Sequence, residues 1–185
     1  IAGRYLYNPD HSARVESYAA KIFQALYQRC GLAYHTGYLL RLAAILHETG
    51  KFINMRKHRV CSYELIRQTD LFSITDEEKE IVASVASYID PYMPSEHADW
   101  VDRNPTPGLE VLISKLQAIF SLADAIDKSH TGKIKQIRTV LGDKELRLYY
   151  QSELDISLER WSFIQASRNF EEIFGITPRL LKGQV

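Results

Sequence analysis

The sequence predicts a mainly α-helical protein with a small β-hairpin near its C-terminal end. Apolar residues recur at spacings of three and four over most of residues 1–130, which is the pattern of helices packed against a core. Beyond this point the pattern changes to short alternating runs on either side of Gly142 and Asp143, which is typical of a hairpin. We therefore expect a helical domain over 1–130, with a hairpin and a last helix packed on it over 131–185.

The first expected helix lies in the stretch "NPDHSARVESYAAKIFQAL", which begins at Asn8. Asn8 or Asp10 can cap its start, and Gly31 can stop the chain soon after Leu26. Residues on one stripe of this helix are apolar, and we expect them to be buried. They are Val15, Tyr18, Ala19, Ile22, Phe23 and Leu26.

The second expected helix runs from about Thr36 to Glu48 and is apolar on most sides. A helix without a polar face is surrounded by other elements, so we expect it to be central. Gly50 stands just beyond it, where a glycine commonly ends a helix. Two ionisable residues, His47 and Glu48, close this apolar segment, and burying them is costly unless each finds a partner.

Three further helices are expected before residue 130. "CSYELIRQTD" is typical of a short helix, and "TDEEKEIVASVASYI" opens with Thr75 and Glu78 in capping-box spacing. "LEVLISKLQAIFSLADAIDKS" predicts a long and largely apolar helix. Residues 90–108 separate the last two and hold four prolines, so we expect a loop there that serves as a lid or a partner surface.

The C-terminal part contains the hairpin "KIKQIRTVLGDKELRLYY" and the helix "LDISLERWSFIQASRNFEEIFG". Gly175 is expected to end this helix. The aromatic side chains of both segments are expected to lie mostly in the core, and an exposed one would mark a contact with another part of the protein or a second subunit. The core candidates of the helix are Leu158, Trp161, Phe170, Ile173 and Phe174.

The composition is that of a globular protein. The chain has 185 residues, 45% of them hydrophobic, and a formal net charge of zero, so strong attraction to nucleic acid or to a membrane is not expected. Two cysteines are too few for a disulfide framework, which favours a reducing cytoplasm. Because the sequence starts at Ile1, we expect it to be a fragment of a longer protein.

Four ionisable residues stand where helices begin, end or are otherwise apolar. They are His11, His47, Glu48 and Asp124. Imidazole and carboxylate groups are ligands for Zn, Mn, Fe or Mg, and a helical bundle can bring them together in its core. Glu48 is also a candidate acid or base. Asp127 is expected to be a surface partner of Lys128 or a nearby arginine, and His130 a surface residue.

The order His, His–acid, Asp resembles the HD superfamily of helical metal-dependent phosphohydrolases. Five stretches in collinear order also look together like the C-terminal half of the exopolyphosphatase and guanosine pentaphosphate phosphohydrolase family (Ppx/GppA). They are "HSARVESYAAKIFQAL", "LLRLAAILHETGKFIN", "KHRVCSYELI", "SLADAIDKS" and "ERWSFIQASRNFEEIFGI". The resemblance implies an HD-domain-like helical bundle over nearly the whole chain, with the hairpin and helix as an appendage.

The resemblance also implies a division of labour. Members of this family carry two N-terminal lobes of the actin-like ATPase fold, which hold the phosphate-binding loops, the catalytic acid and Mg. This sequence contains no glycine-rich phosphate loop of that kind. The helical domain is thought to extend a channel for polyphosphate or guanosine pentaphosphate and to help form a homodimer. On this reading the chain alone does not hydrolyse polyphosphate, and no membrane or specific nucleic acid is a partner.

The metal positions of the HD superfamily fall on His11, His47, Glu48 and Asp124, and His58 is a further candidate. Glu48 stands where that superfamily usually has Asp, and Cys61 stands where many relatives carry another histidine. Two interpretations stay open for the site. It binds one divalent metal (Mn, Zn, Fe or Mg), or it is a metal-free remnant held together by hydrogen bonds.

Two basic clusters can follow a polyanion through its phosphates. We prefer the one directly after the central helix, which consists of Lys51, Arg56, Lys57, His58 and Arg59. The other surrounds the hairpin and consists of Lys128, Lys133, Lys135, Arg138, Lys144 and Arg147. Three functions remain open: a substrate-binding and dimerising domain of an exopolyphosphatase-type hydrolase, an autonomous metal-dependent phosphohydrolase acting on nucleotides or phosphate esters, and a non-catalytic dimerisation module.

Overall fold

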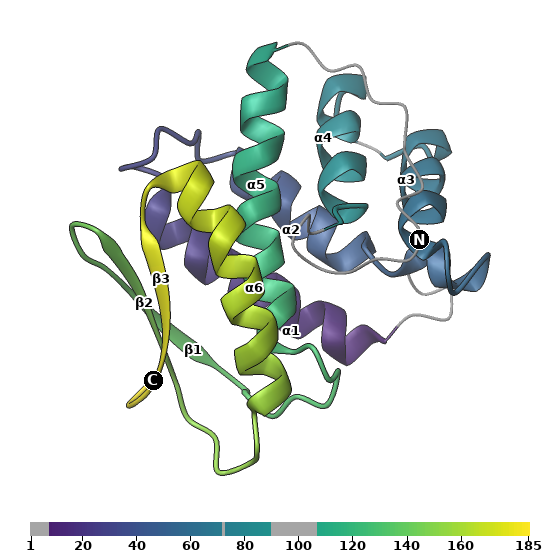
Figure 1. The fold of residues 1–185 in the computed structure, drawn as a ribbon. Helices are drawn as coiled ribbons and strands as arrows, with labels where there is room; N and C mark the ends of the chain where they lie inside the picture. The colour runs from purple at the N-terminus through teal and green to yellow at the C-terminus, as the bar shows by residue number, and fades with distance from the viewer. Residues whose placement is uncertain (1–7, 72, 90–106) are drawn as a thin grey trace.

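The computed structural model describes residues 8–71, 73–89 and 107–185, which form one layered helical body with a small sheet on one side (Figure 1). Within these residues the prediction of a mainly α-helical fold is confirmed. The helices are α1 (Pro9–Leu26), α2 (Thr36–Leu46), α3 (His58–Gln68), α4 (Asp76–Ala86), α5 (Pro107–Ile126) and α6 (Ser157–Phe174), with the short 3-10 helix η2 (Thr49–Phe52). The strands are β1 (Ile137–Leu141), β2 (Glu145–Tyr150) and β3 (Thr177–Lys182).

Helix α1 begins and packs as its sequence predicts. The side chain of Asn8 accepts a hydrogen bond from the His11 backbone N–H at 3.1 Å, which caps the first turn. All six residues of the predicted stripe are buried. This face packs against α2 and α5, so the first turn of α1, including His11, is held close to both helices.

Helix α2 ends two residues earlier than expected, and Gly50 has a different role from the predicted one. The chain leaves α2 at Leu46 and forms η2, and Gly50 is not in the left-handed conformation of a helix-ending glycine. A Cβ atom on Gly50 would lie 2.0 Å from the carbonyl oxygen of His58 and 2.4 Å from the backbone nitrogen of Ser62. Gly50 is therefore needed because η2 lies directly against α3.

Helices α3, α4 and α5 lie where the sequence predicts helices, although α3 begins at His58, before the predicted stretch that starts at Cys61. The capping box between Thr75 and Glu78 at the start of α4 is present. The expected loop over 90–108, with its lid or partner-surface role, lies outside the described residues apart from the start of α5 at Pro107. None of the helices described is long and apolar enough to cross a membrane.

The predicted hairpin is confirmed, and a third strand joins it. Strands β1 and β2 pair antiparallel, with Ile137 opposite Tyr150 and Leu141 opposite Leu146. Strand β3 pairs parallel to β2, which α6 makes possible by crossing back between them (Figure 1). Strand β3 was not expected from the sequence because the short segment contains Pro178, which is tolerated here since β3 is an edge strand.

Helix α6 ends at Gly175 as predicted, where φ is +64°, but its buried face is not the predicted one. Phe170 is buried and Phe174 partly buried, whereas Leu158, Trp161 and Ile173 are exposed. The face toward α5 is shifted by about one position and carries the buried residues Glu159, Ser162, Phe163, Ala166 and Phe170. This face was not predicted because it contains the charged residue Glu159, which breaks the apolar pattern. Inside the protein Glu159 accepts hydrogen bonds from the Ser129 backbone N–H and from Lys133.

One hydrophobic core extends from α1, α2, α4 and α5 to the inner face of the sheet and to α6. Residues from both predicted parts, such as Leu116 of α5 and Leu148 of β2, are completely buried in it. The boundary between residues 130 and 131 stays a prediction. The packing matters for function because it fixes the ends of α1, α2 and α5 against one another.

Candidate metal and phosphate site

The four ionisable residues singled out in the sequence meet at one place. His11 comes from the first turn of α1, His47 and Glu48 directly follow α2, and Asp124 lies in the last turn of α5. His11, His47 and Glu48 are 0%, 4% and 2% exposed, and the side chain of Asp124 is 13% exposed. Three helices that pack together thus place two imidazoles and two carboxylates around a common point.

His11 is oriented by its Nδ1 atom and leaves its Nε2 atom facing this point. Nδ1 lies 2.8 Å from Oδ2 of Asp127, and because a carboxylate only accepts, Nδ1 carries the proton of this hydrogen bond. Nε2 is buried without a hydrogen-bond partner, 3.5 Å from Oδ1 of Asp124 and 3.9 Å from Oε1 of Glu48. A carboxylate that orients a histidine in this way is typical of metal sites.

His47 has the same arrangement with a backbone partner. Its Nδ1 donates to the carbonyl oxygen of Ala44 at 2.7 Å, so the neutral ring of His47 has its lone pair on Nε2. Nε2 of His47 is buried without a hydrogen-bond partner and lies 3.8 Å from Oδ1 of Asp124. The rings of His11 and His47 are tilted by 60° with centroids 5.2 Å apart, so both lone pairs can point at one ion.

The residues present fit a divalent transition metal. Ligand atoms around a tetrahedral ion at about 2.1 Å lie about 3.4 Å apart, and the nitrogen–oxygen distances of His11 and His47 to Asp124 approach this value. The ligand atoms of all three residues lie within 4.8 Å of one another. Two imidazoles and one carboxylate favour Zn, Mn or Fe over Mg, which prefers oxygen ligands. Three protein ligands would leave a position open for water or a phosphate oxygen.

Glu48 lies beside this set of three residues and belongs to a different group. Its Oε1 is in a close ion pair with Nζ of Lys51, and its Oε2 accepts from the backbone N–H of Asn8 at 3.3 Å. The potential ligand atoms of Glu48 group with His11 and His130, not with His47 and Asp124. These contacts hold the carboxylate beside the His11 ring, with Oε1 3.9 Å from Nε2 of His11.

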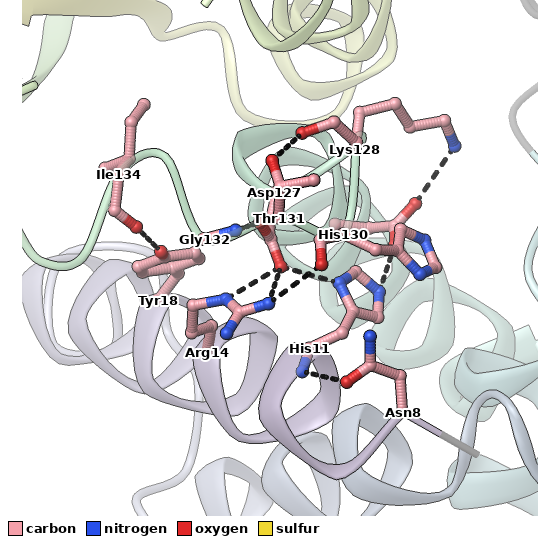
Figure 2. Close-up of polar contacts among 12 residues, drawn as sticks. Asn8, His11, Arg14, Tyr18, Asp127, Lys128, His130, Thr131, Gly132 and Ile134 are labelled. Atoms are coloured by element: carbon pink, nitrogen blue, oxygen red, sulfur yellow. Dashed lines mark hydrogen bonds and ion pairs between the residues drawn. The ribbon is translucent and has the colours of Figure 1, made fainter. Parts of the chain in front are cut away.

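Two residues of this site were misplaced by the sequence analysis, because Asp127 and His130 were expected at the surface. Asp127 is 1% exposed, and its Oδ2 accepts from both His11 and Nε of Arg14, the latter at 2.8 Å (Figure 2). Its other oxygen accepts from the backbone N–H of Gly132 at 2.8 Å. Asp127 therefore pairs with a nearby arginine, which was one of the two expected partners, but the pair lies inside the protein and not at the surface. Its position one turn after Asp124 was the signal.

His130 is half-buried and covers His11. The two rings are stacked at 3.6 Å with an angle of 6°, and Nδ1 of His130 lies 3.6 Å from Oε1 of Glu48. Its backbone has a positive φ of 59°, which is uncommon outside glycine and is held here by the bonds that Asp127 and Arg14 make to this turn. Parallel rings cannot both direct an in-plane lone pair at one ion, so the His11, His47 and Asp124 set is the better metal site.

Charge and burial set the protonation states of the cluster. Burial acts to lower the pKa of His11, but the carboxylates of Asp124 and Asp127 outweigh it and raise the pKa to about 9. Burial lowers the pKa of His47 to about 4. Burial would raise the pKa of Asp124, yet Lys128, whose Nζ is 3.3 Å away, and the histidines hold it well below its usual range. An ion entering the site would displace a proton from His11.

The preferred basic cluster lies next to these residues because η2 and the start of α3 directly follow Glu48. Arg56 and Lys57 are exposed, and Arg59 donates to the carbonyl oxygen of Tyr88. His58 is half-buried with Nδ1 donating to Met55 at 3.1 Å, and burial lowers its pKa. Among the described residues, His58 belongs to neither group of potential metal ligands. Lys51 joins the two clusters through its ion pair with Glu48.

Comparison with known proteins adds one finding. A family model described as Ppx/GppA phosphatase, domain III, matches residues 1–165. This range includes all the residues of the His/Asp/Glu cluster and of the basic cluster. No curated protein matches the chain.

Proposed function

Because this chain belongs to the Ppx/GppA phosphatase family and corresponds to its domain III, we propose that it binds the phosphate chain of a polyphosphate-type substrate. Other domains of the protein would then carry out the hydrolysis. The observation that supports this function best is the position of the exposed Arg56 and Lys57 at the start of α3, beside the cluster that contains Glu48. Guanosine pentaphosphate presents the same phosphate groups and is the alternative substrate.

The start of α3 suits a phosphate group for two physical reasons. Lys57 occupies the cap position without a side-chain cap, so backbone N–H groups of the first turn remain available for an anion. Asn54 fixes the turn before α3, since its Oδ1 accepts hydrogen bonds from the backbone N–H groups of Arg56 and Lys57 at 2.9 and 3.0 Å. The positive charges of these side chains and the helix dipole then act on the same ligand.

Titration of the chain with tripolyphosphate tests this proposal. Replacing Arg56 and Lys57 by glutamine removes two charges from the start of α3, and we expect the dissociation constant to rise about tenfold or more. The control variant carries Arg67→Gln and Arg168→Gln, which remove two charges elsewhere, and should bind as the wild type does. Equal binding by both double variants would contradict the proposed phosphate site.

A second candidate function is an autonomous metal-dependent phosphohydrolase acting on a nucleotide or phosphate ester. It is supported by the two buried Nε2 atoms that face Asp124 without a partner. Here His11, His47 and Asp124 would hold the ion, while Asp127 and the carbonyl group of Ala44 fix the tautomers of the histidines. A bound divalent ion lowers the pKa of its water and polarises a phosphoryl oxygen. Glu48, oriented by Lys51, is the residue of this chain that would hold a proton taken from water at the site.

Metal analysis and phosphate release separate the two functions. After loading with Mn or Zn, the wild type should retain about one equivalent, and His47→Gln should lose most of it. Phosphate release from nucleotides that disappears in the His47→Gln variant would establish the second function. Metal retention without release from nucleotides or phosphate esters would leave the ion as an anchor for a bound phosphate.

Homodimer formation is proposed from the exposed apolar face of α6. Leu158, Trp161 and Ile164 are 46%, 47% and 53% exposed, which is unusual for side chains of this size on one helix. Light scattering during gel filtration should give twice the mass of the chain for the wild type and the single mass for Trp161→Ser. The control Val111→Ser replaces an apolar residue of α5 that is 58% exposed. A wild-type chain with the single mass would exclude dimer formation by this domain alone.

A further inference from the structure

We propose that the solvent-facing side of the three-stranded sheet is a second binding track for inorganic polyphosphate, formed by Arg138, Arg147 and Arg179. Polyphosphate as the occupant rests on the proposed function, whereas the sheet surface is separate from the α3 site. In Figure 1 the sheet and α3 lie on opposite sides of α5 and α6. A short phosphate chain would therefore occupy one site, and a long chain could reach both.

Strand pairing brings the arginines together. Leu146, Leu148 and Tyr150 of β2 are buried, so the alternate residues of this strand, including Arg147, point to the other face. Arg147 is directly opposite Arg179 of the parallel strand β3. Arg138 of β1 is opposite Tyr149, so it lies on the same face one row away. Neighbouring strands are about 4.8 Å apart, so the backbones of Arg147 and Arg179 are close enough for both side chains to contact one phosphate chain.

The charges of this face are poorly balanced. The three strands contain one acidic residue, Glu145, which lies 3.7 Å from Nε of Arg147 and 3.6 Å from Nε of Arg179. One carboxylate is thus shared by two guanidinium groups, at distances that are too long for hydrogen bonds. The Nε atom of Arg147 is also buried without a hydrogen-bond partner. The side chains of Arg147 and Arg179 are 42% and 57% exposed, so their positive charges and outer N–H groups can meet the oxygens of an anion.

The third arginine, Arg138, is positioned by a contact with the aromatic ring of Tyr149. The guanidinium group of Arg138 lies 4.4 Å from the ring centroid of Tyr149, and its Nε donates to the carbonyl oxygen of Gln184 at 3.1 Å. The ring also touches Gly183, where an added Cβ atom would come within 2.9 Å of it. With Arg138 and Gly183 packed against it, Tyr149 is not an open platform for a nucleobase. This arrangement favours a bare phosphate chain over single-stranded RNA, which needs such platforms.

Chain length provides the test. Two sites on one protein bind a polymer that spans them more tightly than a short ligand, because the second contact is made at high local concentration. In the Arg147→Gln, Arg179→Gln variant we expect the affinity for long-chain polyphosphate to fall about tenfold or more, while tripolyphosphate binding changes less than about twofold. The charge-preserving variant with lysine at both positions should keep most of the affinity, and Arg67→Gln with Arg168→Gln should be neutral.

Two results would overturn the inference. One is unchanged affinity of the double glutamine variant for long-chain polyphosphate. The other is equally tight, Arg147- and Arg179-dependent binding of oligouridylate with the same number of phosphates, which would make this face a nucleic-acid surface. The proposed function fails separately, when Arg56→Gln and Lys57→Gln leave tripolyphosphate binding unchanged.

Discussion

The buried cluster around His11 and the basic start of α3 are neighbours in the fold but are built in opposite ways. In the cluster, both histidines are fixed by a second buried group, His11 by Asp127 and His47 by the carbonyl oxygen of Ala44. At the start of α3, Arg56 and Lys57 are exposed, and their backbone N–H groups donate to Oδ1 of Asn54. Changes in the cluster should therefore cost stability, whereas changes at the start of α3 should alter phosphate binding alone.

The largest effect is expected from Asp127→Ala. This change removes the acceptor of three hydrogen-bond donors, from His11, Arg14 and Gly132, and leaves Arg14 without its buried carboxylate. We expect the free energy of unfolding to fall by about 3–5 kcal/mol in urea denaturation. Asp70→Ala, at an exposed position, is the control and should change it by less than about 0.5 kcal/mol. If Asp127→Ala lowered the free energy of unfolding as little as the control does, the buried cluster would not be the rigid region that we infer.

The second largest loss of stability is expected from Gly50→Ala. This change tests the contact between η2, which follows the buried cluster, and α3. The new methyl group would meet the His58 carbonyl oxygen and force η2 away from α3. A cost of about 2–3 kcal/mol in the free energy of unfolding is expected. Gly108→Ala is the matched control, since an added Cβ there meets no atom within 4 Å and alanine favours the helix. An equally stable Gly50→Ala variant would mean that η2 and α3 can separate without cost.

The pH dependence of stability separates the two histidines of the cluster in the metal-free protein. The pKa of His11 rises on folding from 6.5 to about 9, so its stabilisation is complete below 6.5 and is lost as the pH rises through 9. The pKa of His47 falls on folding from 6.5 to about 4, so the unfolded chain binds the extra proton and stability decreases as the pH falls from 6.5 to 4. Thermal unfolding should therefore show the highest stability near neutral pH. His11→Gln should remove the decrease on the alkaline side, and His47→Gln that on the acidic side; unchanged profiles would contradict these assignments.

The smallest effect on stability is expected from Arg56→Gln with Lys57→Gln. Both side chains are exposed, so the free energy of unfolding should change by less than about 0.5 kcal/mol in urea denaturation. This variant sharpens the comparison because it should lose phosphate binding without losing stability. A destabilisation of about 2 kcal/mol or more would show that the start of α3 has a structural role instead.

Much of the helical fold follows from the sequence, because the stripe from Val15 to Leu26 and the box of Thr75 and Glu78 are local patterns. The convergence of His11, His47, Glu48 and Asp124 was expected from the family resemblance, whereas periodicity alone placed each only at a helix end.

The predictions that were wrong concern residues whose burial depends on contacts distant in the sequence. Asp127 is buried and His130 half-buried through contacts with Arg14 and His11, more than a hundred residues away in the chain. The buried stripe of α6 was missed because the charged Glu159 faces inward, where Lys133 and a backbone N–H satisfy it. Strand β3 depends on pairing with β2 across α6, which no local pattern reports. In each case the partner decides the burial, and the partner is not visible in the local sequence.

The salt dependence of tripolyphosphate binding tests the central claim most directly. A phosphate site formed by Arg56 and Lys57 predicts a dissociation constant that rises steeply with salt concentration. In the Arg56→Gln, Lys57→Gln variant the logarithmic slope should become shallower by about one to two, while the Arg67→Gln, Arg168→Gln control keeps the wild-type slope. A double variant at the start of α3 with the wild-type affinity and slope would contradict the account.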